Sequence, residues 1–444
     1  MSVGKRRKSV ASNKNQRTQS FGRDQPLQSQ RLRGSSKLPR WFSASLDVIA
    51  RQRATKEPLE NVVQKTCRTY HLGSKERKQV GDACFAFARA SSSVESAWEA
   101  NHRTHGGRIP DRRTRDHIGL LLVQLWQGNS VESWPMPPEA LLHLLEEPRP
   151  EEILSLPPWM VKRLNKVYQA EASELLHALH KPAPFVIATD PQFINADDLV
   201  EACQQHDCGI TPSPIAPHAF RCDRRFSLQR LPRELRQHVW PMDDGSQLIA
   251  RTLGVQSDDE VLDLCAGGGG KSRILSSLSS SVTALDLSAR RLSSCDSLPL
   301  KTKVVADGRQ PPFPPNTFDR VLVDAPCSGS GTIRRAPDVG ARIEEESIAS
   351  FQSLQVELMR AAIEVTKPGG RLIYATCSLF AEENEEVVQQ ILSEHHTIKE
   401  LPLADAWDFS PRPQLLGNES HFTLLPSKHG TDGFFLATFV KVAK

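Results

Sequence analysis

The chain has 444 residues, of which 39% are hydrophobic and 24% charged, with a net charge of +4 and a mean hydropathy of −0.41. This length predicts two or three domains. No apolar stretch reaches the roughly 18 residues of a membrane span, and no apolar signal-peptide core follows the first residues. We therefore expect a cytoplasmic protein without a membrane partner. Nine cysteines without framework spacing predict free thiols in a reducing compartment.

The first 40 residues form a basic segment. Residues 1–40 contain eleven lysines and arginines against one acid, Asp24, which gives this segment a net charge of +10 and leaves −6 for the remainder. Its polar composition predicts a disordered tail. Such a tail suits phosphate backbones, because each neutralised phosphate releases counterions. A solubilising tail is the alternative, and Lys5 to Lys8 also resembles a nuclear address.

A helical pattern begins at Trp41. Apolar residues follow the i, i+3, i+4, i+7 spacing of an amphipathic helix at Ile118, Leu121, Leu122 and Leu125. Looser stripes occur at residues 46–49 and 80–88. Residues 41–165 are therefore predicted to form an all-α bundle, interrupted at Gly106-Gly107 and at the proline cluster Trp134 to Pro138.

Residues 166–240 are predicted to form a small α+β subdomain. Short apolar runs at Phe185 to Ala188 and Ile210 to Ile215 flank a helical segment, Asp197 to Gln205. A zinc site can be imagined from Cys203, His206, Cys208, His218 and Cys222. However, these residues contain no CxxC pair and Cys203 lies on the apolar side of its helix, so we predict ordinary cysteines and no metal.

From residue 241 the pattern alternates between helices and strands. A helix is predicted at Ser246 to Leu253, and a later one places Ile348, Phe351, Leu354 and Leu358 in register. The predicted strands are Val261 to Leu264, Val282 to Leu285, Thr302 to Val305, Arg320 to Val323 and Arg371 to Ala375. This alternation predicts an α/β domain over residues 241–444, a Rossmann-like, doubly wound parallel sheet with ligands beyond the carboxyl ends of its strands.

The segment VLDLCAGGGGKS, residues 261–272, predicts a strand followed by a cofactor-binding loop. Glycines there let backbone N–H groups approach a ligand. A P-loop would need glycine where this chain has Cys265, and a dinucleotide fingerprint would need Gly or Ala where it has Ser272, so neither ATP nor NAD is favoured. The candidate cofactor-binding residues of the loop are Cys265, Ala266, Gly267, Gly268, Gly269, Gly270 and Lys271.

Asp286 ends the second strand 19 residues after Gly267, where a carboxylate can bond a ribose hydroxyl pair. The alternative is a glycine-rich turn with a helix-capping acid. Asp307 follows the third strand, and together with Asp286 and the glycine loop it can bind the sugar and base of an adenosine cofactor.

The fourth and fifth strands are followed by residues suited to chemistry: Asp324 and Cys327 after the fourth, Cys377 after the fifth. A thiolate at the mouth of a cofactor cleft is a candidate nucleophile, although a single cysteine at a strand end is usually inert. Two cysteines at adjoining strand ends favour a catalytic function.

Five segments, VLDLCAGGGGKS, ALDLSARRL, FDRVLVDAPCSGSGTIRRAPD, IYATCSLFAEENEEVV and LLPSKHGTDGFF, together resemble the Sun family of RNA (cytosine-5) methyltransferases. The helical segment LGSKERKQVGDACFAFAR resembles the NusB-like RNA-binding domain of the family's bacterial enzymes that modify small-subunit ribosomal RNA. The resemblance implies S-adenosylmethionine as cofactor, with Arg291 of the second segment and Asp324 among its contacts. The implied partner is RNA, with ribosomal RNA favoured and transfer RNA as the alternative, and we expect a monomer.

The resemblance also implies catalytic roles. Cys377, the cysteine of the TCS motif, would attack C6 of a flipped-out cytosine, and Cys327 would assist release of the product. Asp324 would hold the N3 edge of the base. Lys271 would support the site electrostatically, or only begin the helix that follows the loop.

The sequence departs from the family in three places. Gly267-Gly268 replaces an Ala-Pro pair, Ala188-Thr189-Asp190 replaces an Arg-Val-Asn segment, and the long basic tail is additional. Two other functions remain open: a DNA cytosine methyltransferase, disfavoured by the Pro-Cys-Ser-Gly sequence and by Cys377, and an RNA-binding ribosome-assembly factor without turnover.

Overall fold

The computed structural model describes residues 38–105, 111–131, 134–135, 156–408 and 412–443. The predicted basic tail lies outside the described residues except at its last positions, as does the predicted break at Gly106-Gly107. No helix in the described part of the chain is long and apolar enough to cross a membrane. All nine cysteines are described, and none forms a disulfide.

The first described region is helical, as predicted. Its helices are α1 (Arg40–Thr55), α2 (Leu59–Thr69), α3 (Ser74–His105) and α4 (Arg112–Trp126). The predicted stripe is confirmed on α4, because Ile118, Leu121 and Leu122 are buried, whereas Leu125 is half-buried. The Asp111 carboxylate accepts a hydrogen bond from the Thr114 N–H and so caps the start of α4.

The second region contains a four-stranded antiparallel sheet in the order β2-β3-β1-β4. Its strands are β1 (Phe185–Thr189), β2 (Ile210–Pro212), β3 (Ala219–Cys222) and β4 (Val239–Pro241). Its helices are α5 (Pro158–Tyr168), α6 (Ala172–His180), α7 (Ala196–Gln204) and α8 (Arg233–Arg236). Cys203, Cys208 and Cys222 lie in the apolar core of this sheet.

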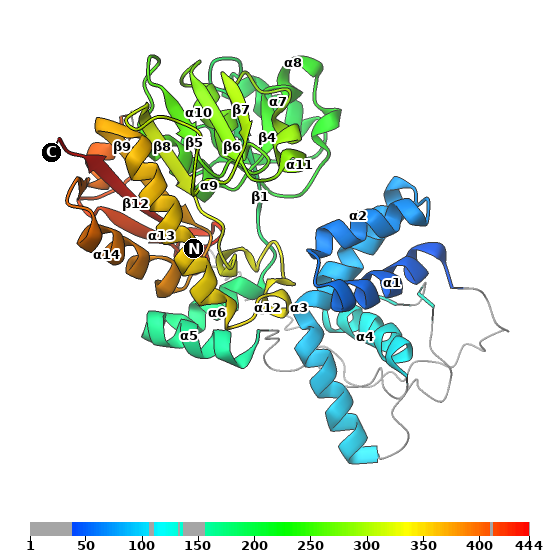
Figure 1. The fold of residues 1–444 in the computed structure, drawn as a ribbon. Coiled ribbons are helices and arrows are strands. Elements are labelled where there is room, and N and C mark those ends of the chain that lie inside the picture. Colours follow the sequence, from blue (N-terminus) through cyan, green and yellow to red (C-terminus); the bar gives the residue numbers. More distant parts are fainter. Residues whose placement is uncertain (1–37, 106–110, 132–133, 136–155, 409–411, 444) are drawn as a thin grey trace, which may run out of the picture. The chain divides into compact units, whose positions relative to one another are not determined.

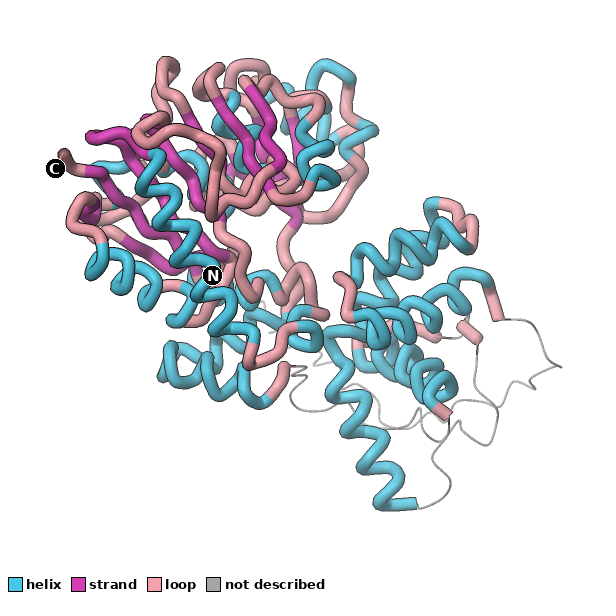
Figure 2. Tube along the Cα trace, viewed as in Figure 1, coloured by secondary structure: helices cyan, strands magenta, loops and turns pink. Residues whose placement is uncertain are grey.

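The third region is built on an eight-stranded sheet with the order β10-β12-β9-β8-β5-β6-β7, in which β11 also pairs with β12 (Figures 1 and 2). Five strands are parallel: β5 (Val261–Asp263), β6 (Val282–Asp286), β7 (Thr302–Val305), β8 (Phe318–Asp324) and β9 (Thr366–Thr376). The predicted Rossmann-like domain is therefore confirmed.

The prediction of a purely parallel sheet was wrong at one edge. Three further strands, β10 (Ile398–Glu400), β11 (His421–Leu424) and β12 (Phe434–Lys441), run antiparallel to their neighbours. β12 pairs with β9 from Phe435 opposite Thr376 to Val440 opposite Arg371. The chain reverses direction between β11 and β12, which pair antiparallel, and β12 then lies beside β9. An antiparallel arrangement of this kind needs no crossover helix, whereas a parallel one does.

Helices cover both faces of this sheet. The helices of this region are α9 (Asp244–Thr252), α10 (Gly270–Ser276), α11 (Ala289–Leu292), α12 (Val339–Arg342), α13 (Ser347–Val365), α14 (Glu385–Glu394), α15 (Leu403–Ala406) and α16 (Pro426–His429). Figure 1 shows α13 and α14 along one face. In β8, Val321 and Val323 pack on that side, whereas Leu322 packs with α9 on the other, because successive strand side chains point to opposite faces.

Candidate functional site

A cavity of about 350 Å³ lies at the carboxyl ends of β5, β8 and β9. Ten of the residues predicted from the sequence line it: Cys265, Ala266, Gly267, Gly268, Gly270, Lys271, Arg291, Asp324, Cys327 and Cys377. The volume lies within the range of ligand-binding pockets. The sheet thus brings the glycine loop and both cysteines to one cavity.

The glycine loop between β5 and α10 is shaped by its backbone. Gly267 and Gly269 have φ angles of +57° and +80°, which side chains other than glycine rarely adopt. Gly269 does not line the cavity, and a Cβ there would lie 2.5 Å from the Cys295 Sγ. A Cβ at Gly270 would meet nothing within 4 Å, so this part of the loop leaves open space for a ligand.

Asp286 lies behind the loop rather than in the cavity lining. It is buried, and its Oδ2 accepts a hydrogen bond of 2.9 Å from the Gly267 N–H. Its Oδ1 accepts from the Ser288 N–H and pairs with Arg291 at 2.9 Å. The carboxylate therefore fixes the loop and orients Arg291.

Asp307 lies outside the cavity lining and forms an ion pair with Arg309, with 2.6 Å between the charged groups. Hydrogen bonds from Arg309 lower the pKa of Asp307. Two apolar side chains at the ends of the neighbouring strands are unusually exposed: Leu287 is 71% exposed and Val305 is 57% exposed. They form an apolar surface beside the end of β6, where the sequence predicts an adenosine site.

Lys271 and Asp324 form an ion pair inside the cavity, with 2.6 Å between Nζ and Oδ2. Lys271 is buried, whereas the Asp324 side chain is 32% exposed and can meet a ligand. Burial acts to lower the pKa of Lys271, but the Asp324 carboxylate outweighs it and raises that pKa above its ordinary value. Lys271 is therefore a cation next to the two cysteines and not only the first turn of α10.

The sulfur atoms of Cys327 and Cys377 lie 3.3 Å apart. The hydrogen bond with Cys377 and burial raise the pKa of Cys327 well above its ordinary value. Lys271 interacts electrostatically with Cys377. Both thiols therefore lie in one cavity with the Lys271 ammonium, and the raised pKa of Cys327 favours its neutral thiol form.

A buried carboxylate, Glu383, holds the segments that follow the two cysteines. Its Oε1 accepts a hydrogen bond of 2.8 Å from the Ser328 N–H, and its Oε2 accepts one of 2.5 Å from the Ser378 Oγ. Asn384 adds bonds to the Thr376 Oγ1 and the Ser378 carbonyl. These residues lie in the motif IYATCSLFAEENEEVV, but sequence analysis assigned them no role.

Further residues of the lining were not predicted, among them Met242, Ser246 and Asp263. Met242 and Ser246 precede the first strand of the sheet and carry no sequence signal for a ligand site. Burial raises the pKa of Asp263 to about 7. Its Oδ2 accepts a hydrogen bond from the Ser272 Oγ, whereas its buried Oδ1 has no partner. That oxygen is available to a donor group of a ligand.

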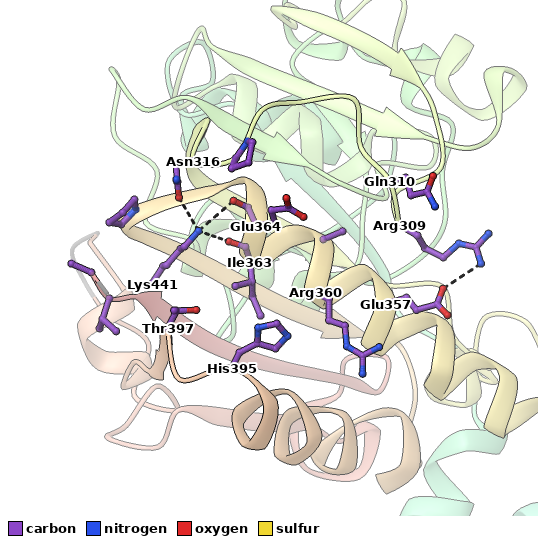
Figure 3. Close-up of a pocket in the computed structure, with 15 residues that line it drawn as sticks. Arg309, Gln310, Asn316, Glu357, Arg360, Ile363, Glu364, His395, Thr397 and Lys441 are labelled. Atoms are coloured by element: carbon purple, nitrogen blue, oxygen red, sulfur yellow. Dashed lines mark hydrogen bonds and ion pairs between the residues drawn. The ribbon is translucent and has the colours of Figure 1, made fainter.

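A larger cavity of about 990 Å³ lies away from the cysteines, beside the last turn of α13 (Figure 3). Its basic side chains are already paired within the chain. Arg309 binds Glu357, and Arg360 binds Glu394. Lys441 donates to the carbonyl groups at the carboxyl end of α13, including that of Ile363, and so caps the helix. This cavity offers no comparable set of reactive groups.

Within the described parts of the chain, no group of three or more His, Cys, Asp or Glu side chains is placed to hold a metal ion. Three of the residues considered for zinc are instead buried in the core of the small sheet. Burial raises the pKa of Cys203 to about 11, which disfavours the thiolate that metal binding requires.

The sequence matches two protein-family models. Residues 250–440 match "16S rRNA methyltransferase RsmB/F", and residues 156–229 match the ferredoxin-like domain of RsmF/B-like methyltransferases. Among curated proteins, the ribosomal RNA small subunit methyltransferase B of Yersinia pestis is 32% identical over 300 residues, and that of Photorhabdus laumondii is 29% identical over 302. Each alignment covers 64% of this chain and 66% of the relative, just under two thirds of its length.

Solved structures have the same fold. The crystal structure of PH0851 aligns with a TM-score of 0.70 at 21% identity and covers 92% of this chain and 100% of the other. A methyltransferase homologue from Pyrococcus horikoshii aligns with a TM-score of 0.53 at 27% identity and covers 69% and 100%. NSun6 from the same organism, solved with SFG, aligns with a TM-score of 0.54 at 19% identity and covers 66% and 100%.

Proposed function

We propose that the chain, whose residues 156–229 and 250–440 match models of the RsmB/F family of 16S rRNA methyltransferases, is an S-adenosylmethionine-dependent RNA (cytosine-5) methyltransferase acting on ribosomal RNA. The observation that carries the proposal is the pair of cysteine sulfurs 3.3 Å apart beside the Lys271–Asp324 ion pair.

The residues of the cavity fit the cofactor. The unpaired Oδ1 of Asp263 suits a donor group of the amino acid part, and the open space at Gly270 admits a ligand close to the backbone. Leu287 and Val305 offer exposed apolar surface for the adenine ring. Asp286 and Asp307 remain candidates for the ribose and the base, in competition with their present partners, Arg291 and Arg309. Bound S-adenosylmethionine would supply an electrophilic methyl group.

The two cysteines are proposed to act at different steps of the reaction on the cytosine. The Cys377 thiolate adds to C6 of the cytosine, and the electron pair moves to C5, which becomes nucleophilic. Asp324, whose side chain is partly exposed in the cavity, would hold the N3 edge of the cytosine, where charge develops in this step. After C5 carries the methyl group, its remaining proton leaves to a base, the C5–C6 double bond forms again, and the Cys377 sulfur departs. Cys327, a thiol within 3.3 Å of that sulfur, assists its release.

The other two regions would hold the RNA. We assign an RNA-binding role to the NusB-like helical region, residues 41–165, and to the α+β subdomain, residues 166–240. The names of the relatives favour ribosomal over transfer RNA. An assembly factor without turnover remains the alternative, but the reactive residues are all present in one cavity, which supports an active enzyme.

The test is methyl transfer to ribosomal RNA that carries no modifications, followed by digestion and mass spectrometry of the nucleosides. We expect 5-methylcytidine with the wild type and no product with Cys377→Ala. Cys67→Ala serves as the control, because this cysteine lies in the helical region and should leave the product unchanged. Absence of any methylated nucleoside with the wild type, while S-adenosylmethionine still binds, would favour the assembly factor.

A further inference from the structure

Three large apolar side chains are strongly exposed in the described part of the chain: Phe193, Leu287 and Val305. The last two flank the proposed adenine site, which leaves Phe193, 60% exposed, without a role. Its ring stacks on the His238 imidazole, with 4.1 Å between ring centroids and 18° between the planes. The Phe193–His238 pair therefore presents a flat aromatic face at the surface of the α+β subdomain.

Backbone bonds fix this pair in place. The Asp190 N–H donates to the His238 carbonyl at 3.0 Å, and the Phe193 N–H donates to the Asp190 carbonyl at 3.2 Å. The Gln192 Nε2 donates to the Ser277 carbonyl at 2.8 Å and ties the loop to the end of α10. Because the rings are already ordered, a ligand that stacks on them loses little conformational entropy on binding.

Arginines lie near His238, one in space and two along the chain. The Arg273 guanidinium lies 4.1 Å from the centroid of the Trp240 ring and donates to the carbonyl of Gln237, the residue before His238. Arg233 and Arg236 on α8 are exposed, and Arg236 donates to the Gln229 carbonyl at 3.5 Å. Aromatic rings interleaved with arginines are the arrangement by which proteins bind single-stranded nucleic acids.

The pair lies close to the proposed active site along the chain. β4 begins directly after His238 and leads to Met242, which lines the cavity. Four residues of extended chain span about 13 Å. From the other side, α10 carries both Lys271, inside the cavity, and Arg273. An RNA strand whose target base enters the cavity would reach the pair with a nearby nucleotide.

We propose that the Phe193–His238 pair is a platform on which an unpaired base of the RNA, near the target cytosine, stacks. This inference rests on the proposed function and deepens it, because it assigns a subsite for the substrate strand. The exchange of Arg-Val-Asn for Ala188-Thr189-Asp190 lies at the end of β1, directly before this loop. Stacking of a base on Phe193 would contribute affinity for RNA at that edge of the subdomain, where this chain lacks the arginine of the Arg-Val-Asn segment.

The test measures binding of a 20-nucleotide mixed-sequence RNA by fluorescence anisotropy, as a single strand and as a duplex, in the absence of S-adenosylmethionine. Phe193→Ala should weaken single-strand binding by at least about 5-fold, the lower end for loss of one stacked base. His238→Ala should also weaken it, whereas Phe193→Trp should retain it. Gln204→Ala, an exposed change on α7 of the same subdomain, should leave it unchanged. Duplex binding should be insensitive to all four changes.

A second measurement reports stacking directly. 2-Aminopurine, placed in turn at the positions flanking the target cytosine, should be quenched at one position by the wild type and not by Phe193→Ala. Single-strand binding by Phe193→Ala within 2-fold of the wild type, or equal losses for single strand and duplex, would overturn the platform. The readout is separate from methyl transfer. If the wild type methylates RNA but Phe193→Ala binds RNA normally, only the platform is refuted. If RNA binding depends on Phe193 but the wild type transfers no methyl group, only the proposed enzymatic activity is refuted.

Discussion

Cys327 and Cys377 lie in contact, with 3.3 Å between their sulfur atoms. Two thiolates at 3.3 Å would repel each other, so one proton is retained by the pair. The hydrogen bond and burial raise the pKa of Cys327 and so favour its thiol form, while the Lys271 ammonium lies close enough to interact with Cys377. This arrangement is compatible with the proposed roles of Cys377 as nucleophile and Cys327 as the assisting thiol.

Glu383 is expected to position both cysteines. Glu383→Ala leaves the buried Ser328 N–H without its acceptor, which should cost roughly 1–3 kcal/mol, and it removes one of the partners of the Ser378 Oγ. At a temperature where the variant remains folded, kcat should fall, and more RNA should remain covalently attached because Cys327 is misaligned. Glu383→Gln should recover most of the activity, since an amide can bond both partners.

The matched control is Glu386→Ala, an exposed change three residues further along the chain that should alter neither kcat nor the attached fraction. A Glu383→Ala variant that loses stability but keeps the wild-type ratio of attached to released RNA would show that Glu383 has only a structural role.

Asp263 makes the stability of the protein depend on pH. Its pKa in the folded state, about 7, is above the ordinary value of 3.8, so the folded protein binds this proton more tightly than the unfolded chain does. Its contribution to stability is therefore largest below about pH 4 and is lost as the pH rises to about 7. Asp263→Asn should raise the melting temperature, relative to the wild type, more at pH 8 than at pH 5.

Thermal unfolding at the two pH values, without cofactor, checks this prediction. Asp111→Asn is the control, because hydrogen bonds from Thr114 lower the pKa of Asp111 and the group stays ionised from pH 5 to pH 8. Its effect should be the same at both values. An equal effect of Asp263→Asn at pH 5 and pH 8 would contradict a raised pKa.

Two adjacent glycines in the turn from β5 to α10 are expected to have different roles, one in folding and one in ligand binding. Gly269 has a φ angle of +80° and faces the Cys295 Sγ, whereas Gly270 faces open space. The sequence predicted the loop from its four glycines but could not distinguish their roles, because the difference depends on Cys295, which is distant in the sequence.

Gly269→Ala should therefore destabilise the fold by roughly 1–3 kcal/mol, from strained backbone and the contact with Cys295. Gly270→Ala, inside a helix, should leave stability equal or slightly higher but weaken S-adenosylmethionine binding, because its Cβ enters the cavity. Chemical denaturation and calorimetric titration of the cofactor test the pair. The reverse pattern, with Gly270→Ala unstable and Gly269→Ala deficient only in binding, would refute the assignment.

The sequence predicted those strands whose position can be recognised from a single short segment. The five parallel strands were predicted from apolar runs that end in polar residues, and the cavity formed where those ends meet. The antiparallel edge was missed because the position of β12 depends on pairing with β9, about 65 residues earlier. The contribution of Met242 to the cavity was missed for a similar reason, since only the assembled sheet brings it there.

On the scale of the whole molecule, the residues that follow Cys377 belong to a shared core. Leu379 and Phe380 pack with Met160 and Leu164 of α5, so the α+β region supports the segment that carries Cys377, the proposed nucleophile. The sequence assigned domains by composition and could not reveal this contact. The catalytic segment and the proposed RNA platform are thus both linked to residues 156–240.

The proposed function depends on Cys377 acting as the nucleophile toward RNA. The most direct measurement incubates Cys327→Ala with S-adenosylmethionine and ribosomal RNA, isolates RNA-bound protein under denaturing conditions, and identifies the modified peptide by mass spectrometry. We predict a covalent adduct on Cys377 that is absent from the Cys327→Ala, Cys377→Ala double variant. An adduct on another residue, or no adduct while 5-methylcytidine still forms in a Cys377→Ala variant, would contradict it.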